Sequence, residues 1–157
     1  MKKLFYSAFA LALSANFALA NQNSVTDSKE TLEIVNAKPQ PLSFIKNYKG
    51  KTVKASKLLD NPIVKARLIK LIGNDDYVFL KKNWNVEEPI SVVGNTAEAS
   101  GCKVHDCGNT NFILLFDITD NIIQVGIRKN GGKALIISED PERSIPGDLE
   151  EWSKRNQ

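Results

Sequence analysis

Three apolar runs near the carboxyl end of the chain, joined by short polar connections, limit the fold more than any other feature. They cover residues 112–116, 122–127 and 134–137. The second connection contains Asn-Gly-Gly at residues 130–132, a sequence that favours a tight β-hairpin. Because connections this short can join only antiparallel neighbours, the runs predict a three-stranded antiparallel meander.

The first of these runs, residues 112–116, is apolar at every position. Such a strand is typical of the centre of a sheet that is covered on both faces. A helix is predicted at residues 62–72, because Asn61 and Pro62 form a favoured helix start and Gly73 a favoured stop. This helix is the expected cover for one face of the sheet.

Three further segments complete the predicted domain. Residues 77–80 are expected to form a short strand or a helix fragment, and residues 90–93 a strand. Residues 148–152 are expected to form a short helix, with Asp148 and Glu151 at the spacing of a capping box. The fold class that follows is α+β: one antiparallel β-sheet with helices packed on it.

The first twenty residues have the composition of a secretory signal peptide. Lys2 and Lys3 give a positive start, residues 4–13 form an apolar run, and small residues at 18–20 suit cleavage before Asn21. The run is too short for a transmembrane anchor, and no later stretch reaches the roughly 18 apolar residues that a span needs. No cysteine follows the cleavage point, so we expect no lipid anchor and a periplasmic protein.

Cleavage would leave residues 21–157 as a single domain, with residues 21–29 as a loose polar arm. The first twenty residues hold two of the 21 basic side chains and none of the 18 acidic ones, so the remainder has a net charge of about +1. A nucleic-acid-binding protein needs a concentrated basic surface. The chain shows only scattered basic pairs such as Lys81 and Lys82, and we expect no nucleic-acid partner.

The most informative segment is the cysteine loop, residues 102–107, which reads Cys-Lys-Val-His-Asp-Cys between Gly101 and Gly108. It contains both cysteines of the chain and its one histidine. In an exported protein the default expectation is a disulfide between Cys102 and Cys107. A ring this small adds only about 2 kcal/mol of global stability, but it restricts the side chains that it encloses.

Other interpretations of the cysteine loop remain open from the residues alone. A stapled surface turn without a function is one. A zinc site is another, although the spacing is uncommon and a fourth ligand is not evident. Catalysis by His105 beside Asp106 has no accompanying nucleophile motif; the S-x-x-K pattern at residues 43–46 lacks its companion motifs, and Asp117 and Asp120 have the character of turn residues. We expect no catalytic residue, cofactor or metal.

Residues 101–108 resemble the CKPHDC loop of the Ivy family, bacterial periplasmic inhibitors of vertebrate (C-type) lysozyme. The similarity covers about residues 97–127. It implies an inhibitor rather than an enzyme, with a disulfide-closed loop that protrudes from the domain and enters the lysozyme cleft. The histidine of that loop, here His105, meets both catalytic carboxylates, and some members of the family are homodimers. The loop residues that this resemblance assigns are Cys102, Lys103, Val104, His105, Asp106 and Cys107.

Two features depart from the family pattern. Val104 stands where the family usually has proline, which removes part of the stiffness of the loop. The net charge near +1 gives little electrostatic attraction for a basic C-type lysozyme. An inhibitor or immunity protein against another cell-wall hydrolase therefore remains an alternative, as does a metal-binding or enzymatic module that uses His105. Within the loop, Lys103 is expected at the rim of the contact and Asp106 as a brace.

Overall fold

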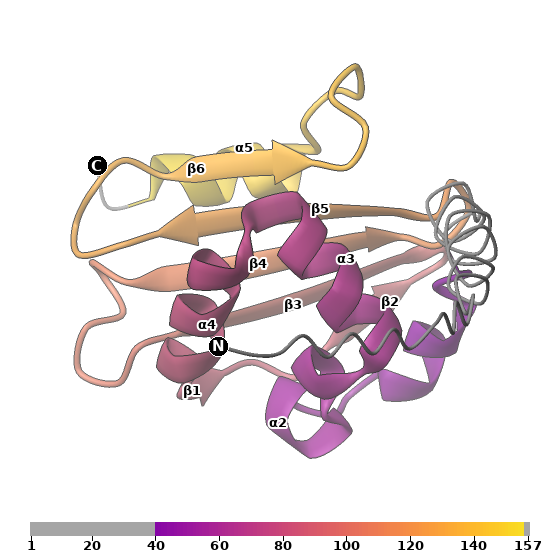
Figure 1. Cartoon of the computed structure of the whole chain (residues 1–157), viewed down its shortest axis with the longest axis horizontal. Coiled ribbons are helices and arrows are strands. Elements are labelled where there is room, and N and C mark those ends of the chain that lie inside the picture. Colours follow the sequence, from indigo (N-terminus) through magenta and orange to yellow (C-terminus); the bar gives the residue numbers. More distant parts are fainter. Residues whose placement is uncertain (1–39, 156–157) are drawn as a thin grey trace, which may run out of the picture. The chain divides into compact units, whose positions relative to one another are not determined.

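The computed structural model describes residues 40–155, so the predicted signal peptide and the polar arm lie outside the described residues. The predicted meander is confirmed. It consists of β4 (Asn111–Asp117), β5 (Ile122–Arg128) and β6 (Leu135–Ser138), each antiparallel to the next (Figure 1). The tight turn predicted at residues 130–132 is also confirmed. Asn130 and Gly131 both have positive φ, and the amide of Gly132 donates to the carbonyl of Lys129 over 2.9 Å.

Three more strands extend the sheet beyond β4. The strand β3 (Thr96–Cys102) pairs with β4 along its whole length. Two short strands, β1 (Val86–Glu87) and β2 (Ser91–Val93), share the outer edge of β3. The strand order is β1-β3-β4-β5-β6, with β2 beside β3, and every pairing is antiparallel. The predicted strand at residues 90–93 is thus confirmed as β2, whereas β3 was not predicted as a strand.

Helices cover both faces of the sheet, as an α+β fold requires. In Figure 1, α3 and α4 cross the near face while α5 lies behind β6. The apolar stretch 77–80, predicted as a short strand or helix fragment, lies within α4. The helical elements are η1 (Ser43–Tyr48), α2 (Val53–Ser56), η2 (Leu58–Asp60), α3 (Pro62–Ile72), α4 (Asn74–Asn83) and α5 (Gly147–Lys154).

The start of α3 is built as its sequence predicts. The side chain of Asn61 accepts hydrogen bonds from the amides of Ile63 (3.0 Å) and Val64 (3.3 Å), and Pro62 takes the first helical position, where an amide proton is not needed. Gly73 ends the helix at a φ of +80°, a conformation that favours glycine, and α4 begins directly after it.

The predicted capping box at the carboxyl-terminal helix is wrong. The helix α5 begins at Gly147, and no side chain caps it. Instead the carbonyl of Pro146 accepts hydrogen bonds from the amides of Leu149 (3.1 Å) and Glu150 (3.0 Å). Asp148 consequently lies inside the first turn, where a carboxylate favours the helix through the helix dipole rather than by capping.

The central strand β4 is buried on both faces, as its continuous apolar sequence predicts. Alternate residues face opposite sides, so one set joins the core under α3 and α4 and the other joins the smaller core under α5. Gly126 on β5 makes room for the second core, because a Cβ there would lie 2.5 Å from the ring of Trp152. The first set is Phe112, Leu114 and Phe116, and the second is Ile113 and Leu115, packed against Leu149 and Trp152.

Two buried arginines tie separate elements together. Arg128 of β5 is 2% exposed and donates to the main-chain carbonyls of Ser153 (2.9 Å) and Arg155 at the end of α5. Arg67 of α3 donates to the carboxylate of Glu139 (2.9 Å) and to the carbonyl of Asn121 (2.6 Å). Last-turn carbonyls and buried carboxylates are favourable partners for a guanidinium, so both arginines help to hold helices on the sheet.

Candidate functional site

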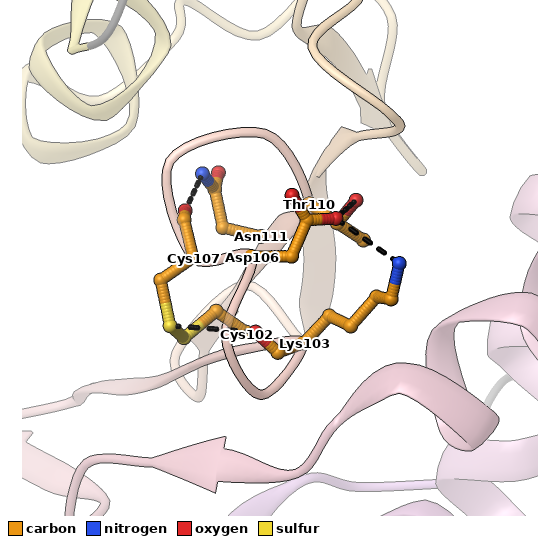
Figure 2. Close-up of a disulfide and its surroundings, with 6 residues drawn as sticks. All are labelled: Cys102, Lys103, Asp106, Cys107, Thr110 and Asn111. Atoms are coloured by element: carbon orange, nitrogen blue, oxygen red, sulfur yellow. Dashed lines mark hydrogen bonds and ion pairs between the residues drawn. A yellow bond between two sulfur atoms is a disulfide. The ribbon is translucent and has the colours of Figure 1, made fainter.

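The cysteine loop forms the turn between β3 and β4 and extends past the ends of both strands (Figure 1). A disulfide joins Cys102 and Cys107, whose Cα atoms are 4.9 Å apart, as the sequence predicts (Figure 2). Beyond the ring, the side chain of Asn111 donates to the carbonyl of Cys107 over 2.7 Å. The Cys107 sulfur lies 3.6 Å from the carbonyl oxygen of Lys103, a contact without a donor because a disulfide sulfur has no hydrogen.

The disulfide also bears on the zinc interpretation. Because Cys102 and Cys107 are bonded to each other, neither sulfur is available as a thiolate ligand. Within residues 40–155, no group of three or more histidine, cysteine, aspartate or glutamate side chains is placed to hold a metal ion.

Inside the ring the chain makes a tight turn. The amide of Asp106 donates to the carbonyl of Lys103 over 3.0 Å, which places Val104 and His105 at the two central positions. His105 has a φ of +61°, and Val104 is not among the residues with positive φ. Positive φ at the second central position alone is the pattern of a type II turn, in which proline is common at the first central position. Val104 thus occupies the place that suits the family's proline.

The carboxylate of Asp106 holds this turn through three side chains. One oxygen accepts from the side-chain amide of Asn109 (2.9 Å). The other accepts from the hydroxyl of Thr110 (2.9 Å) and the ammonium of Lys103 (3.1 Å), two contacts that Figure 2 shows. Hydrogen bonds from Asn109, then Thr110, then Lys103 lower the pKa of the Asp106 carboxyl. Asp106 is therefore a brace, although it bonds neither His105 nor backbone amides with its side chain.

A second loop supports the first from outside. In this β5–β6 loop (residues 129–134), the amide of Asn130 donates to the hydroxyl of Thr110 (3.1 Å), and the amide of Gly131 donates to the carbonyl of Asn109 (2.8 Å). Thr110 is fully buried between the two loops. The β5–β6 loop is in turn fixed to α4 by an ion pair between Lys129 and Asp76. The sequence predicts a tight turn in the β5–β6 loop, but it does not predict that this loop supports the cysteine loop.

What the loop leaves exposed is its tip. Val104 is 46% exposed, and His105 is exposed as well. Among residues 40–155, no hydrogen bond or ion pair involves the imidazole of His105, while its neighbours Lys103 and Asp106 are paired with each other. The loop therefore presents an apolar side chain and an unengaged imidazole on a backbone that is held by the disulfide, the turn hydrogen bond and the Asp106 carboxylate.

The two glycines beside the loop have different roles. Gly101 lies within β3 against Trp84, where a Cβ would come 2.4–2.8 Å from the indole ring. Trp84 in turn stacks on Phe112 with ring centroids 5.7 Å apart. Gly101 therefore permits close packing at the base of the loop. Gly108 has open space where its Cβ would be, and nothing in the structure explains a need for glycine there.

The other segments weighed from the sequence do not join this loop. Lys46 of the S-x-x-K pattern bonds the side chain of Asn95 over 2.7 Å. Asp117 and Asp120 lie at the β4–β5 turn and both pair with Arg143. They are turn residues, as expected.

A comparison with protein families matches residues 63–157 to the family described as "Inhibitor of vertebrate lysozyme (Ivy)". The chain belongs to the Ivy family. The match begins in α3 and includes the whole sheet, the cysteine loop and α5, and so extends beyond residues 97–127, which carry the resemblance in the sequence. Ivy is a family of lysozyme inhibitors rather than enzymes, which makes lysozyme the class of partner.

No curated protein and no solved structure matches the chain. Across residues 40–155, no helix combines the length and the apolar character needed to cross a membrane.

Proposed function

We propose that this Ivy-family protein inhibits a C-type lysozyme by inserting the cysteine loop into the catalytic cleft, with His105 as the group that blocks it. The observation that carries the proposal is the state of His105. Its imidazole is exposed and has no intramolecular partner in the described chain, yet its backbone is held by a disulfide, a turn and the Asp106 carboxylate.

The chemistry of the target favours an imidazole. A retaining glycosidase has two carboxyl groups about 5–5.5 Å apart, one protonated and one ionised. A neutral imidazole can accept a hydrogen bond at one ring nitrogen and donate at the other. His105 between those carboxyl groups satisfies both and takes the place of the scissile bond.

The rigidity of the loop supports this role. Binding with an already ordered loop avoids the entropy cost of fixing it at the interface. Because the carboxylate of Asp106 accepts from Lys103, Asn109 and Thr110, that order exists in the free protein. Val104, exposed beside His105, adds apolar area that the cleft can bury.

The proposed setting follows from the amino terminus. Residues 1–20 act as a cleavable signal peptide, and residues 21–157 form one inhibitor domain in the periplasm. There the protein meets lysozyme that has reached the cell wall, and it acts by binding alone.

A titration of lysozyme activity tests the proposal. The protein should inhibit a C-type lysozyme with a defined stoichiometry, and a chito-oligosaccharide that fills the catalytic cleft should compete with it. Binding that a saturating oligosaccharide leaves unchanged would place the contact outside the cleft and contradict loop insertion.

A second target class is favoured by one observation, the net charge of about +1 after removal of the signal peptide. An inhibitor of this charge has little electrostatic attraction for a basic enzyme. The same assay run on a wall amidase and on lysozymes of other types decides between the targets: inhibition of one of these enzymes without inhibition of the C-type enzyme would transfer the proposal to that hydrolase.

A further inference from the structure

The cysteine loop by itself is too small to form a stable complex with an enzyme. Stable protein–protein interfaces bury about 800 Å² on each partner and involve roughly 20–30 residues a side. Within the ring, only Val104, His105 and Cys107 are exposed. An enzyme that takes the loop into its cleft must therefore also contact the surfaces beside the base of the loop.

Two surfaces of different character flank that base. On the side of β4, the β5–β6 loop exposes Asn130, two glycines and Lys133, which form a polar surface. On the side of β3 lies β1, where Val86 pairs directly with Cys102. Because register partners on antiparallel strands share one face of the sheet, the side chain of Val86 lies beside the disulfide. It is 44% exposed, so the β1 side offers an accessible apolar group.

An open groove of about 170 Å³ lies next to Val86. We call it the base groove, since it includes both cysteines of the ring. It is on the face of the sheet that α5 covers, because a residue of that helix lines it. The apolar part of its lining is Val86, the disulfide of Cys102 and Cys107, Phe112 and Trp152.

The polar groups of the base groove are largely engaged. The carboxylate of Glu87 accepts from the amide of Lys54 over 3.0 Å, and the side chain of Asn111 donates to the carbonyl of Cys107 over 2.7 Å. Glu88 is exposed and forms no ion pair with another residue of the described chain. An apolar centre with a polar rim is the usual anatomy of a protein–protein contact.

The size of the base groove limits its occupant. Small-molecule pockets have volumes of roughly 300–1,000 Å³, and this groove is smaller. It suits one side chain of a protein partner. Interfaces gain most of their binding energy where a few such side chains fill apolar pockets near the centre of the contact.

We propose that the base groove receives an aliphatic or aromatic side chain from the wall of the lysozyme cleft when the cysteine loop is inserted. This inference rests on the proposed function and adds the feature of the enzyme that is recognised. It makes Val86 a specificity-determining residue, because an enzyme with a polar residue at that place gains less from burial in the groove.

Two exposed valines on the same sheet provide a matched test. Val86→Asp should weaken inhibition of a C-type lysozyme by about tenfold or more, because it places a charge in the apolar contact. Val93 is 75% exposed on β2 and pairs with Thr96 at the opposite end of β3. Val93→Asp should therefore inhibit within about twofold of the parent.

Thermal melts and a milder variant exclude an effect on folding. The two aspartate variants should melt at similar temperatures, since both valines are exposed on short strands. Val86→Thr keeps the shape and the strand propensity of the side chain, and burial of its hydroxyl should still weaken inhibition by about fivefold.

Methyl NMR of the parent gives a readout that needs no substitution. Addition of the lysozyme should shift the methyl signals of Val86 and leave those of Val93 unchanged. The opposite flank is tested by Lys133→Ala, which should change inhibition by no more than about twofold, as expected of a residue at the rim.

Four results would overturn the inference: inhibition by Val86→Asp equal to that of the parent, an equal loss from Val93→Asp, unchanged methyl signals of Val86, or a larger loss from Lys133→Ala. If His105→Ala still abolishes inhibition in that case, the proposed function stands without the base groove. A parent protein that inhibits no C-type lysozyme would overturn both.

Discussion

His105 has a backbone conformation that is unfavourable for a residue with a side chain, and its surroundings keep it there. A φ of +61° lies in the left-handed region, which costs a non-glycine residue on the order of 1–3 kcal/mol. The turn hydrogen bond from Asp106 to Lys103 and the disulfide supply the constraint. The side chain that this conformation carries is exposed at the tip of the loop.

Replacing His105 with alanine should abolish most of the inhibition. Truncation of a residue at the buried centre of an interface typically costs 2 kcal/mol or more, which is at least about thirtyfold in affinity. Since the side chain is exposed and unpaired in the free protein, the melting temperature should not change. The inhibition constant and a thermal melt measure the two effects, with Lys65→Ala, an exposed change on α3, as the control. Unaltered inhibition by His105→Ala would refute the plug mechanism.

Val104→Pro should stabilise the protein. Proline presets φ for the first central position of a type II turn, and no hydrogen bond from the amide of Val104 exists in the described structure to be lost. A compatible change to proline raises the free energy of unfolding by about 0.4–1 kcal/mol, because it restricts the unfolded chain. Urea denaturation of the two proteins tests this, and a less stable proline variant would show that the turn is not type II.

Asp106 should make the loop tolerant of mild acid. Its hydrogen bonds lower the pKa of the carboxyl in the folded protein below the value of about 3.9 in an unfolded chain. The stabilisation from this group is therefore complete only above about pH 5, and it is lost as the pH falls past the unfolded value and through the lowered one. Amide hydrogen exchange at residues 103–110 should stay slow from pH 7 to pH 5 in the parent. The Asp106→Ala variant should exchange faster throughout that range, and equal protection in both proteins would assign the rigidity to the disulfide alone.

At the scale of secondary structure, predictability followed the strength of the local pattern. The strands β4, β5 and β6 are marked by apolar runs and turn chemistry, and α3 by Asn61, Pro62 and Gly73. The strand β3 was missed because its residues are small or polar and have low strand propensity. They form a strand because Ala97 and Ala99 fit under the helices while β4 supplies the hydrogen bonds.

The candidate site was predictable only in part for a related reason. Two cysteines around a histidine are visible in the sequence, and so is the disulfide that they form. The support given to Thr110 by Asn130 is not, because the two residues are twenty positions apart and meet only once the sheet has brought the two loops together. The contact of Arg128 with the end of α5 is not predictable either, because Arg128 and Ser153 are also far apart in the sequence.

Opening the ring tests whether the loop and the sheet are independent elements. In a Cys102→Ser, Cys107→Ser double variant, the stability should fall by about 2 kcal/mol, the entropy contribution of so small a ring. The strands β3 and β4 should keep their pairing, so circular dichroism should match that of the parent, while inhibition weakens because the loop regains freedom. Mass measurement of the alkylated parent without reductant should find no free thiol. Loss of the sheet signal in the double variant would mean that the ring is part of the core.

For the whole molecule, stability rests on two cores that share one sheet. The larger core lies under α3 and α4 and the smaller under α5, and β4 contributes to both. The ion pair between Arg67 and the half-buried Glu139 joins α3 to the residue that follows β6. A defect in β4 should therefore affect the entire domain, whereas a defect in the cysteine loop should remain local.

Leu114→Ala measures this difference. The side chain is fully buried at the centre of β4, and its truncation should lower the free energy of unfolding by about 2–5 kcal/mol. Urea denaturation should show one transition shifted to lower concentration, and the fraction that is folded should inhibit lysozyme like the parent. A loss of less than 1 kcal/mol would show that the core closes around the missing atoms.

The pairing of β3, β4, β5 and β6 in the order in which they occur along the chain also bears on how the protein reaches its folded state. Each strand meets its partner by closing one short loop, so the search for native contacts is mostly local, and folding should be fast for a β-rich protein of this length. The cysteine pair is itself only five positions apart and lies at the end of one of these hairpins. Oxidation can then follow strand pairing rather than guide it, and a reduced chain should refold at nearly the rate of the oxidised one.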